Sequence, residues 1–263
     1  MKKSLQNFPE RPFLSVIIPA FNEAENFKRG VLGQIRSYFE TQNFSWEAIL
    51  VNDGSTDETK KLLEDFAKKN RGFRLINKEH GGKLAAIETG VRKASGEIIL
   101  FTDFDQSTPI SEFSKFLPHF KKGADIVIGS RMNKVSKRIG DRPFRYFRSK
   151  VLNLIIKIFL FRGISDTQCG FKAGKARALK NLFDNLQVTK LAKPAAGFMG
   201  PFDIELLYLS KKLNYKIYQV PIIWRYFPSK RLSVVAEPAK FLIDIFKIKL
   251  FDILGKYEFI KSS

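Results

Sequence analysis

Acidic and amide side chains follow three hydrophobic runs near the start of the chain. The runs are residues 13–19, 48–51 and 97–102, and they lead into Asn22-Glu23, Asn52-Asp53 and Asp103-Phe104-Asp105. Packing does not explain a carboxylate where a buried strand emerges, because carboxylates are rarely buried unless they are paired. Three such segments in succession predict one site at the carboxyl edge of a parallel sheet, where open α/β sheets bind ligands.

Asp103 and Asp105 are separated by one residue, a spacing that suits a hard divalent cation. Mg²⁺ or Mn²⁺ held by one or two carboxylates neutralises, as a Lewis acid, the charge that develops on a leaving diphosphate. The predicted chemistry is therefore the transfer of a sugar from a nucleoside diphosphate. We assign both residues to the metal site, with Asp105 as the preferred ligand and Asp103 orienting the ribose or a metal-bound water. An Asp-x-Asp triplet also occurs on solvated loops, but its position after the apolar run 98–101 favours the functional interpretation.

The segment 52–57, Asn-Asp-Gly-Ser-Thr-Asp, has two interpretations. Ser55 and Asp57 are of the types that begin helices, so the segment suits a turn followed by a helix. Asp53 is different because it stands at the strand end, where its carboxylate would accept hydrogen bonds from a base or a ribose. Glu23 is ambiguous in the same way, since the helix dipole favours an acidic residue near a helix start.

Strand and helix signals alternate through the first half of the chain. Apolar runs predict strands at 13–18, 46–51, 73–77, 97–102 and 125–129. Helices are predicted at about 25–41, after a Ser55-x-x-Glu58 capping box, at 83–94, and from Thr108-Pro109 to about 121. Near-continuous apolar strands are typical of a sheet covered on both faces. The expected fold is α/β, with a doubly wound, mostly parallel sheet flanked by helices.

The second half is less regular. It predicts a helix at 144–161, a loop at 163–172, a helix at 202–213, a strand at 216–223 and a final helix at about 238–254. No repeat, low-complexity tract or linker divides the sequence, so we expect a single domain. Its nucleotide-binding half would span about 12–130 and its acceptor half about 131–235, followed by a C-terminal amphipathic helix at 237–254.

The 263 residues carry a formal net charge of +20, which indicates an anionic partner. The single cysteine excludes an internal disulfide and a cysteine-based zinc site. Lys and Arg are spread along the chain without a nucleic-acid-binding motif. The acids at the strand ends would also repel nucleic-acid phosphates unless a cation intervened. Phosphate ligands or an acidic membrane are therefore the expected partners, and no nucleic acid.

Two segments suit a membrane surface. Residues 144–161 and 241–254 carry apolar faces edged with Lys and Arg, as interfacial helices on an anionic bilayer do. For the first segment, core packing or a homo-oligomer interface is an equally supported interpretation. No apolar run reaches the roughly 18 residues that span a bilayer. We expect a cytoplasmic protein, peripherally associated with the inner face of a membrane.

Several segments together resemble a known family. Residues 15–23 (SVIIPAFNE), 51–57 (VNDGSTD) and the Asp103/Asp105 pair, in this order and spacing, are similar to family 2 inverting glycosyltransferases of the GT-A fold. Residues 166–172 (DTQCGFK) and 201–208 (PFDIELLY) resemble its polyprenyl-phosphate branch, and most of all the dolichyl-phosphate β-glucosyltransferases. The resemblance covers roughly residues 12–235.

The resemblance implies a role for each matching residue. The nucleoside would be held by Pro19, Ala20, Asn22, Glu23 and Asp53. The reaction would be served by Asp103, Asp105, Arg131, Gln168 and Asp203. The acceptor phosphate would meet Arg131, Lys172, Arg225 and Lys230. Two positions depart from the family pattern: Ser107 stands where related mannosyl enzymes carry a further metal-ligand Gln, and Lys83 follows His-Gly-Gly instead of lying in Gly-Lys-Gly.

The acceptor decides what the mechanism needs. A lipid phosphate is already ionised at neutral pH, so positive charge that positions two anionic groups would suffice. A sugar hydroxyl would need a carboxylate base, for which Asp203 is the candidate. We therefore expect a metal-dependent, inverting transfer of glucose from UDP-glucose to a polyprenyl or dolichyl phosphate. The alternatives are mannosyl transfer from GDP-mannose and transfer to a saccharide. A nucleotidyltransferase would show a Gly-rich loop after the first strand, and residues 19–22 do not form one.

Overall fold

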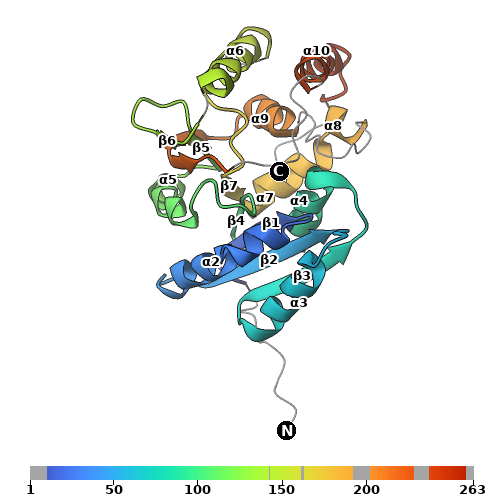
Figure 1. The fold of residues 1–263 in the computed structure, drawn as a ribbon. Helices are drawn as coiled ribbons and strands as arrows, with labels where there is room; N and C mark the ends of the chain where they lie inside the picture. The colour runs from blue at the N-terminus through green and yellow to red at the C-terminus, as the bar shows by residue number, and fades with distance from the viewer. Residues whose placement is uncertain (1–10, 142, 161–162, 192–201, 228–236, 259–263) are drawn as a thin grey trace.

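The computed structural model describes residues 11–141, 143–160, 163–191, 202–227 and 237–258. Within these ranges the chain forms a seven-stranded sheet of order β3-β2-β1-β4-β7-β5-β8, with helices on both faces (Figure 1). Its strands are β1 Leu14–Ala20, β2 Trp46–Asp53, β3 Phe73–Lys78, β4 Ile98–Phe101, β5 Ile126–Ser130, β7 Lys172–Lys175 and β8 Ile217–Pro221. A small separate sheet pairs β6 Lys137–Ile139 with β9 Ile223–Arg225.

Most strand pairs of the large sheet are parallel. β1 pairs in parallel with β2 and β4, β2 with β3, and β5 with β8. β7 lies between β4 and β5 and runs antiparallel to both. The predicted mostly parallel sheet is therefore confirmed, with one antiparallel strand that the sequence did not predict.

Helices bury the two faces of this sheet. The structure has α1 Ala24–Lys28, α2 Val31–Glu40, α3 Thr59–Lys69, α4 Gly82–Lys93, the 3₁₀ helix η1 Ile110–Lys115, α5 Leu117–Lys121, α6 Pro143–Phe159, α7 Ala176–Asn185, α8 Val188–Leu191, α9 Phe202–Lys212 and α10 Glu237–Ile253. In β1, Ile17 packs in the cluster under α4, α7 and α9, whereas Val16 and Ile18 pack in the cluster under α2 and α3. Both faces of the strand are thus buried, which explains its almost continuous apolar sequence.

Four predicted elements differ in the structure. The helix at 25–41 is two helices, because Gly30 takes a left-handed φ of 75° between α1 and α2. The helix at 108–121 is η1 followed by the short α5, which has Pro118 in its first turn. The end of the predicted loop at 163–172 begins β7, and α7 follows it. The strand at 216–223 is divided between β8 and β9.

The capping box predicted from Ser55 and Glu58 is wrong. α3 begins at Thr59, whose N–H is accepted by Asp57 Oδ1 at 2.9 Å. The Ser55 hydroxyl oxygen instead accepts the N–H of Asn22 at 3.0 Å. Asp57 therefore serves the helix start, and Ser55 joins the loops that follow β1 and β2.

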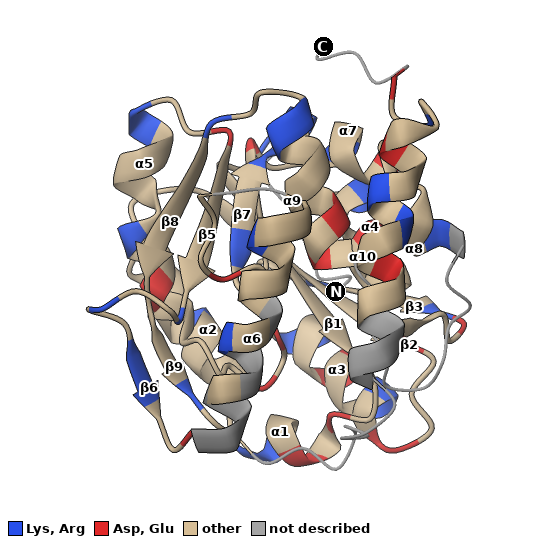
Figure 2. Ribbon diagram, turned by 90° about the horizontal axis from the view of Figure 1, so that it is seen from above, with Lys and Arg blue, Asp and Glu red and all other residues tan. Residues whose placement is uncertain are grey.

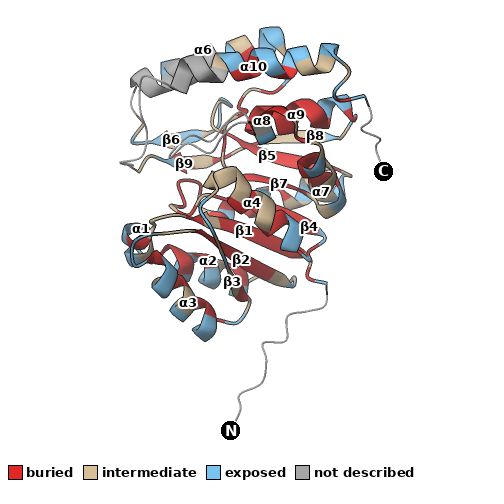
Figure 3. Ribbon diagram, turned by 90° about the vertical axis from the view of Figure 1, so that its right-hand side faces the viewer, coloured by how far each residue is buried: buried red, intermediate tan, exposed pale blue. Residues whose placement is uncertain are grey.

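α6 and α10 lie on the outer side of the layer formed by α9 (Figure 3). They contact each other through the rings of Phe159 and Phe246, whose centroids are 5.2 Å apart. No helix in the described part of the chain is both long and apolar enough to cross a membrane. In the described part of the chain, lysine and arginine residues are distributed over many elements of the ribbon (Figure 2), as their spread along the sequence predicted.

The C-terminal region is tied to the core by Glu205, a fully buried residue of α9. Its carboxylate accepts the N–H groups of Val188 at 2.8 Å and Thr189 at 2.7 Å, which begin α8. It also accepts the hydroxyl of Tyr257 at 2.7 Å. One carboxylate thus joins α9, the start of α8 and the segment that follows α10.

We expect Glu205→Ala to lower the free energy of unfolding by about 3 kcal/mol, because the donors at the start of α8 and the Tyr257 hydroxyl lose a buried charged acceptor. Urea unfolding followed by circular dichroism measures the change. Glu58→Ala removes an exposed carboxylate at a helix start and should change the same quantity by less than about 0.5 kcal/mol. Equal stability of the two variants would show that Glu205 does not anchor these segments.

Candidate active site

The ends of the strands bring the acidic segments together. In the parallel register Ala20 lies beside Asn52, and Ile17 lies beside both Ile49 and Phe101. The loops that follow β1, β2 and β4 therefore leave the sheet at the same edge. The sequence predicted this geometry, and the strand register confirms it.

Asp105 is held in a tight turn after β4. Its Oδ1 accepts the N–H of Ser107 at 2.8 Å, and its Oδ2 accepts the Ser107 hydroxyl at 3.0 Å. Between them, Gln106 has a left-handed φ of 52°, a conformation that costs energy for a non-glycine residue. Burial and the nearby charge of Asp103 raise the pKa of Asp105 above the usual range. Ser107, the residue at the position of the missing Gln, thus fixes the orientation of this carboxylate.

Asp103 forms an ion pair between its Oδ1 and the ammonium group of Lys83. Burial opposes its ionisation, but the charge of Lys83 outweighs this effect and lowers the pKa of Asp103. Its carboxylate also packs against Gly170, where an added Cβ would lie 2.8 Å from Asp103 Cγ. Only glycine leaves room for the carboxylate at that place, a constraint that the sequence did not reveal.

The two carboxylates fit a divalent cation. They are hard oxygen donors on one turn, and a positive charge between them would offset both the burial and the repulsion from Asp103 that raise the pKa of Asp105. The described residues contain no group of three or more His, Cys, Asp or Glu that would enclose a metal ion. Mg²⁺ is commonly bound by one or two carboxylates together with substrate phosphates and water, so two carboxylates are a sufficient protein contribution.

Asp53 shapes the loop that precedes Lys83. Its side chain is 3% exposed and accepts the N–H groups of Gly81 at 3.0 Å and Gly82 at 2.8 Å, while Lys78 Nζ lies 2.6 Å from Oδ1. These contacts hold the loop between β3 and α4 against the end of β2. The Asp53 carboxylate therefore already has partners in the protein. Its predicted contact with a nucleoside stays a prediction.

The other predicted nucleoside residues lie at the end of β1 and just beyond it. Ala20 is buried and Pro19 is partly buried. Asn22, with a φ of 51°, accepts the N–H of Thr56 at 2.8 Å through its side-chain oxygen. The N–H of Glu23 donates to the Thr59 hydroxyl at 2.7 Å. These bonds join the first two acidic segments, and the assigned nucleoside contacts stay predictions.

Arg131 follows β5 and forms a two-pronged ion pair with Asp166. Its Nε and Nη2 each lie 2.8 Å from a carboxylate oxygen, and its backbone N–H donates to Oδ2 at 2.8 Å. Asp166 is fully buried, and although burial opposes ionisation, Arg131 lowers the pKa of this carboxyl. The guanidinium therefore has a protein partner that the sequence did not predict. Its contact with an acceptor phosphate stays a prediction.

Lys172 and Asp203 form a second buried ion pair, between β7 and the first turn of α9. Nζ lies 2.5 Å from Oδ1, and both side chains are less than a tenth exposed. The pair joins the two segments that resemble the polyprenyl-phosphate branch. Asp203 therefore enters the site as the partner of a lysine, and the assigned roles of both residues stay predictions.

The remaining predicted residues are spread around these pairs. Gln168 is partly buried in the loop between Asp166 and Gly170. Arg225 has an exposed side chain, but its N–H donates to the Ser107 carbonyl at 2.7 Å, which places β9 against the Asp105 turn. Lys230 lies outside the described residues. Cys169 is buried, and this burial raises the pKa of its thiol to about 11, which disfavours the thiolate form.

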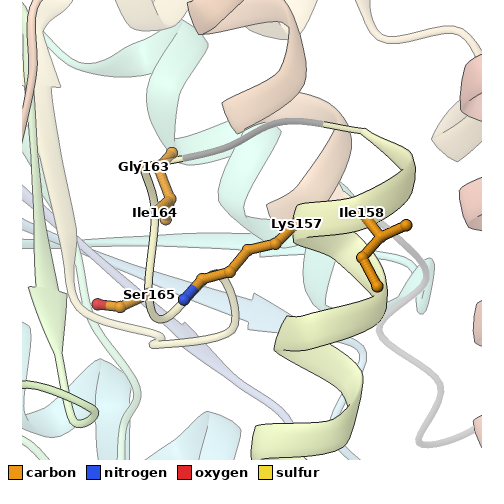
Figure 4. Close-up of a pocket in the computed structure, with 5 residues that line it drawn as sticks. All are labelled: Lys157, Ile158, Gly163, Ile164 and Ser165. Atoms are coloured by element: carbon orange, nitrogen blue, oxygen red, sulfur yellow. The ribbon is translucent and has the colours of Figure 1, made fainter.

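A cavity of about 480 Å³ lies between α6 and the loop that leads to Asp166 (Figure 4). Its lining residues are Lys157, Ile158, Gly163, Ile164 and Ser165. The amino group of Lys157 points toward Ser165 across the cavity. The Ser165 and Ser130 hydroxyls lie 3.1 Å apart, so the cavity adjoins the residues that precede Arg131 and Asp166.

Residues 15–183 match the family model described as glycosyl transferase family 2. The chain belongs to this family. A dolichyl-phosphate beta-glucosyltransferase of Trichomonas vaginalis is 30% identical over 262 residues, which are 95% of this chain and 77% of the relative. The protein of that name from Drosophila melanogaster is 32% identical, over 88% of this chain and 72% of its own length. The one from Saccharomyces cerevisiae is 27% identical, over 94% and 77%.

Solved structures of other glycosyltransferases share the fold of this family 2 enzyme. Residues 1–349 of S. aureus TarS in complex with UDP-GlcNAc superpose with a TM-score of 0.59 and 20% identity; 92% of this chain is covered, and the chain spans 66% of that structure. Mycobacterium tuberculosis glucosyl-3-phosphoglycerate synthase, solved with Mn²⁺, UDP and glucosyl-3-phosphoglycerate, superposes with a TM-score of 0.53 and 17% identity, covering 96% and 82%. The predicted GT-A fold, the resemblance to family 2 and the assignment as a glycosyltransferase are confirmed.

Proposed function

We propose that this glycosyltransferase moves glucose from UDP-glucose to a polyprenyl phosphate of the dolichyl type, with inversion and with a divalent cation at Asp103 and Asp105. The proposal rests on the turn in which two hydrogen bonds from Ser107 orient the Asp105 carboxylate. This turn lies in a chain that aligns along almost its whole length with dolichyl-phosphate beta-glucosyltransferases. The uridine donor is further supported by two of the solved neighbours, TarS and glucosyl-3-phosphoglycerate synthase, which were solved with UDP-GlcNAc and with UDP.

The charges of the site suit two anionic substrates. When bound, the divalent cation would supply Lewis-acid neutralisation of the leaving diphosphate. Asp103 and Asp105 would hold it, with Asp105 oriented by Ser107. An acceptor phosphate arrives ionised and needs positioning rather than deprotonation, so the basic residues Arg131 and Lys172 suit the acceptor side. Asp203 pairs with Lys172, and a lipid-phosphate acceptor leaves this carboxylate free of any role as a base.

A direct assay tests the donor and the acceptor together. The protein is incubated with Mg²⁺ or Mn²⁺, polyprenyl phosphate and labelled UDP-glucose or GDP-mannose, and the label extracted with the lipid is counted. We expect lipid-borne glucose. Mannose in the lipid extract would support the proposed mechanism but show that the donor is GDP-mannose. A protein that binds UDP but labels no lipid would indicate that the acceptor is a saccharide.

The acceptor lipid gives the outer face of α6 and α10 a function. Side chains there that are half or more exposed are Phe147, Leu154, Ile158, Ile243, Phe246, Leu250 and Ile253. Exposed lysines accompany them, Lys150 and Lys157 on α6 and Lys247 and Lys249 on α10. Apolar side chains beside lysines suit the surface of an anionic bilayer, and the net charge of +20 adds to the attraction. We include in the proposal that this face lies on the membrane that holds the acceptor.

Replacing Phe246 and Leu250 together by Asp should weaken binding to anionic phospholipid vesicles by about tenfold or more, because two inserted apolar groups are lost and two repelled charges are gained. Co-sedimentation with vesicles of phosphatidylcholine and phosphatidylserine measures the change. Val135→Asp, at an exposed apolar residue before β6, is the control and should weaken binding much less. Unchanged vesicle binding of the double variant, with a dimer of the wild type that the variant loses in light scattering, would identify the face as a homo-oligomer interface instead.

A further inference from the structure

Lys83 stands in the centre of the acidic site although no role follows from its sequence position alone. It is the second residue of α4, and its ammonium group pairs with Asp103 Oδ1 with only 22% of the side chain exposed. The turn before it is fixed, because Gly82 has a left-handed φ of 84° and donates its N–H to Asp53 at 2.8 Å. The loop therefore aims Lys83 at the carboxylate that a divalent cation also needs.

One carboxylate cannot serve both cations equally well. A divalent ion bound at Asp103 and Asp105 would bring two further positive charges close to the Lys83 ammonium. Like charges that share one carboxylate partner repel strongly in a partly buried site. The donor diphosphate supplies the anion that this ammonium then lacks. Lysine is a common phosphate ligand because its compact charge on a flexible stem does not require one fixed geometry.

We propose that Lys83 is an exchangeable counter-cation, which pairs with Asp103 before the donor binds and moves to the donor diphosphate when the divalent cation takes Asp103 and Asp105. The inference rests on the proposed function, because it requires a diphosphate donor and a metal ion. As a consequence, binding of the metal ion and binding of the donor diphosphate depend on each other. Lys83 competes with the metal ion when no donor is present, and it holds the diphosphate when the metal ion is present.

The two effects have opposite signs, which makes them testable without measuring catalysis. Mn²⁺ binding to the protein alone is followed by the loss of the free-ion signal in electron paramagnetic resonance. UDP binding at saturating Mn²⁺ is followed by calorimetry. For Lys83→Met we expect Mn²⁺ alone to bind about tenfold more tightly and UDP to bind about tenfold more weakly, effects within the ordinary range of coupling between two ligands.

Two matched variants define the result. Lys93→Met removes the same charge from the exposed far end of α4 and should leave both constants within about twofold of the wild type. Lys83→Arg keeps the positive charge, so its dissociation constants for Mn²⁺ alone and for UDP should lie closer to the wild-type values than those of Lys83→Met. A thermal melt of each variant shows that the fold is retained.

The possible failures are distinguishable. Weaker or unchanged Mn²⁺ binding by Lys83→Met, with normal Mn²⁺ and UDP binding by the wild type, would overturn the exchange alone. Tighter Mn²⁺ binding with unchanged UDP binding would likewise overturn it, because Lys83 would then not reach the diphosphate. A wild-type protein that binds no Mn²⁺ would overturn the metal site of the proposed function, and the exchange with it.

Discussion

Asp105→Asn is expected to lower the rate of sugar transfer about a thousandfold, as the loss of a principal group that stabilises transition-state charge commonly does. The amide keeps the shape of the side chain and its bond from the Ser107 N–H, so the turn should remain folded. What would be lost is the negative charge that, in the proposed function, holds a divalent cation able to neutralise the leaving diphosphate. The turnover number at saturating donor and metal ion measures the effect, and a thermal melt confirms the fold.

The control for this variant is Asp65→Asn, which removes an exposed carboxylate from α3. It should leave the turnover number within about twofold of the wild type. An Asp105→Asn enzyme that keeps more than about a tenth of the wild-type rate would show that Asp105 is not the principal metal ligand. Asp103→Asn would then be the informative variant, with its ion pair to Lys83 as the structural difference.

The strands that carry the site were predictable because their physical signal is local. β1, β2 and β4 are buried on both faces, so each contains a near-continuous apolar run that leads into the polar residues of the site. β7 has no such signal. Its sequence is Lys-Ala-Gly-Lys, and the burial of Lys172 depends on Asp203, which lies 31 residues away. A short strand whose side chains are satisfied only by distant partners cannot be recognised from its own residues.

The types of the site residues could be predicted, but their partners could not. The sequence marked Asp103 and Arg131 as functional, yet it did not show that Lys83 and Asp166 pair with them. Hydrogen bonds across 20 and 35 residues depend on how loops from different strands meet. Gly170 was missed for the same reason, because its lack of a side chain matters only where the Asp103 carboxylate packs against it.

Arg131→Met should lower the free energy of unfolding by about 3–5 kcal/mol, because it leaves the fully buried Asp166 without its ion-pair partner. Urea unfolding measures the loss. Arg92→Met breaks the ion pairs of a half-exposed arginine with Glu88 and Asp184 and should cost less than about 1 kcal/mol. A loss from Arg131→Met as small as that control would mean that Asp166 is satisfied without the guanidinium.

The double variant Arg131→Met/Asp166→Leu separates the two roles of Arg131. Removing both charges should restore most of the stability, because a buried ion pair replaced by apolar groups is often neutral. If Arg131 also meets the acceptor phosphate, the refolded double variant still transfers sugar poorly, with its main defect at low concentrations of the lipid phosphate. If transfer returns with stability, the guanidinium only holds Asp166. In that case the positive charge on the acceptor side must come from other residues, of which Lys172 and Arg225 are the predicted ones in the described structure.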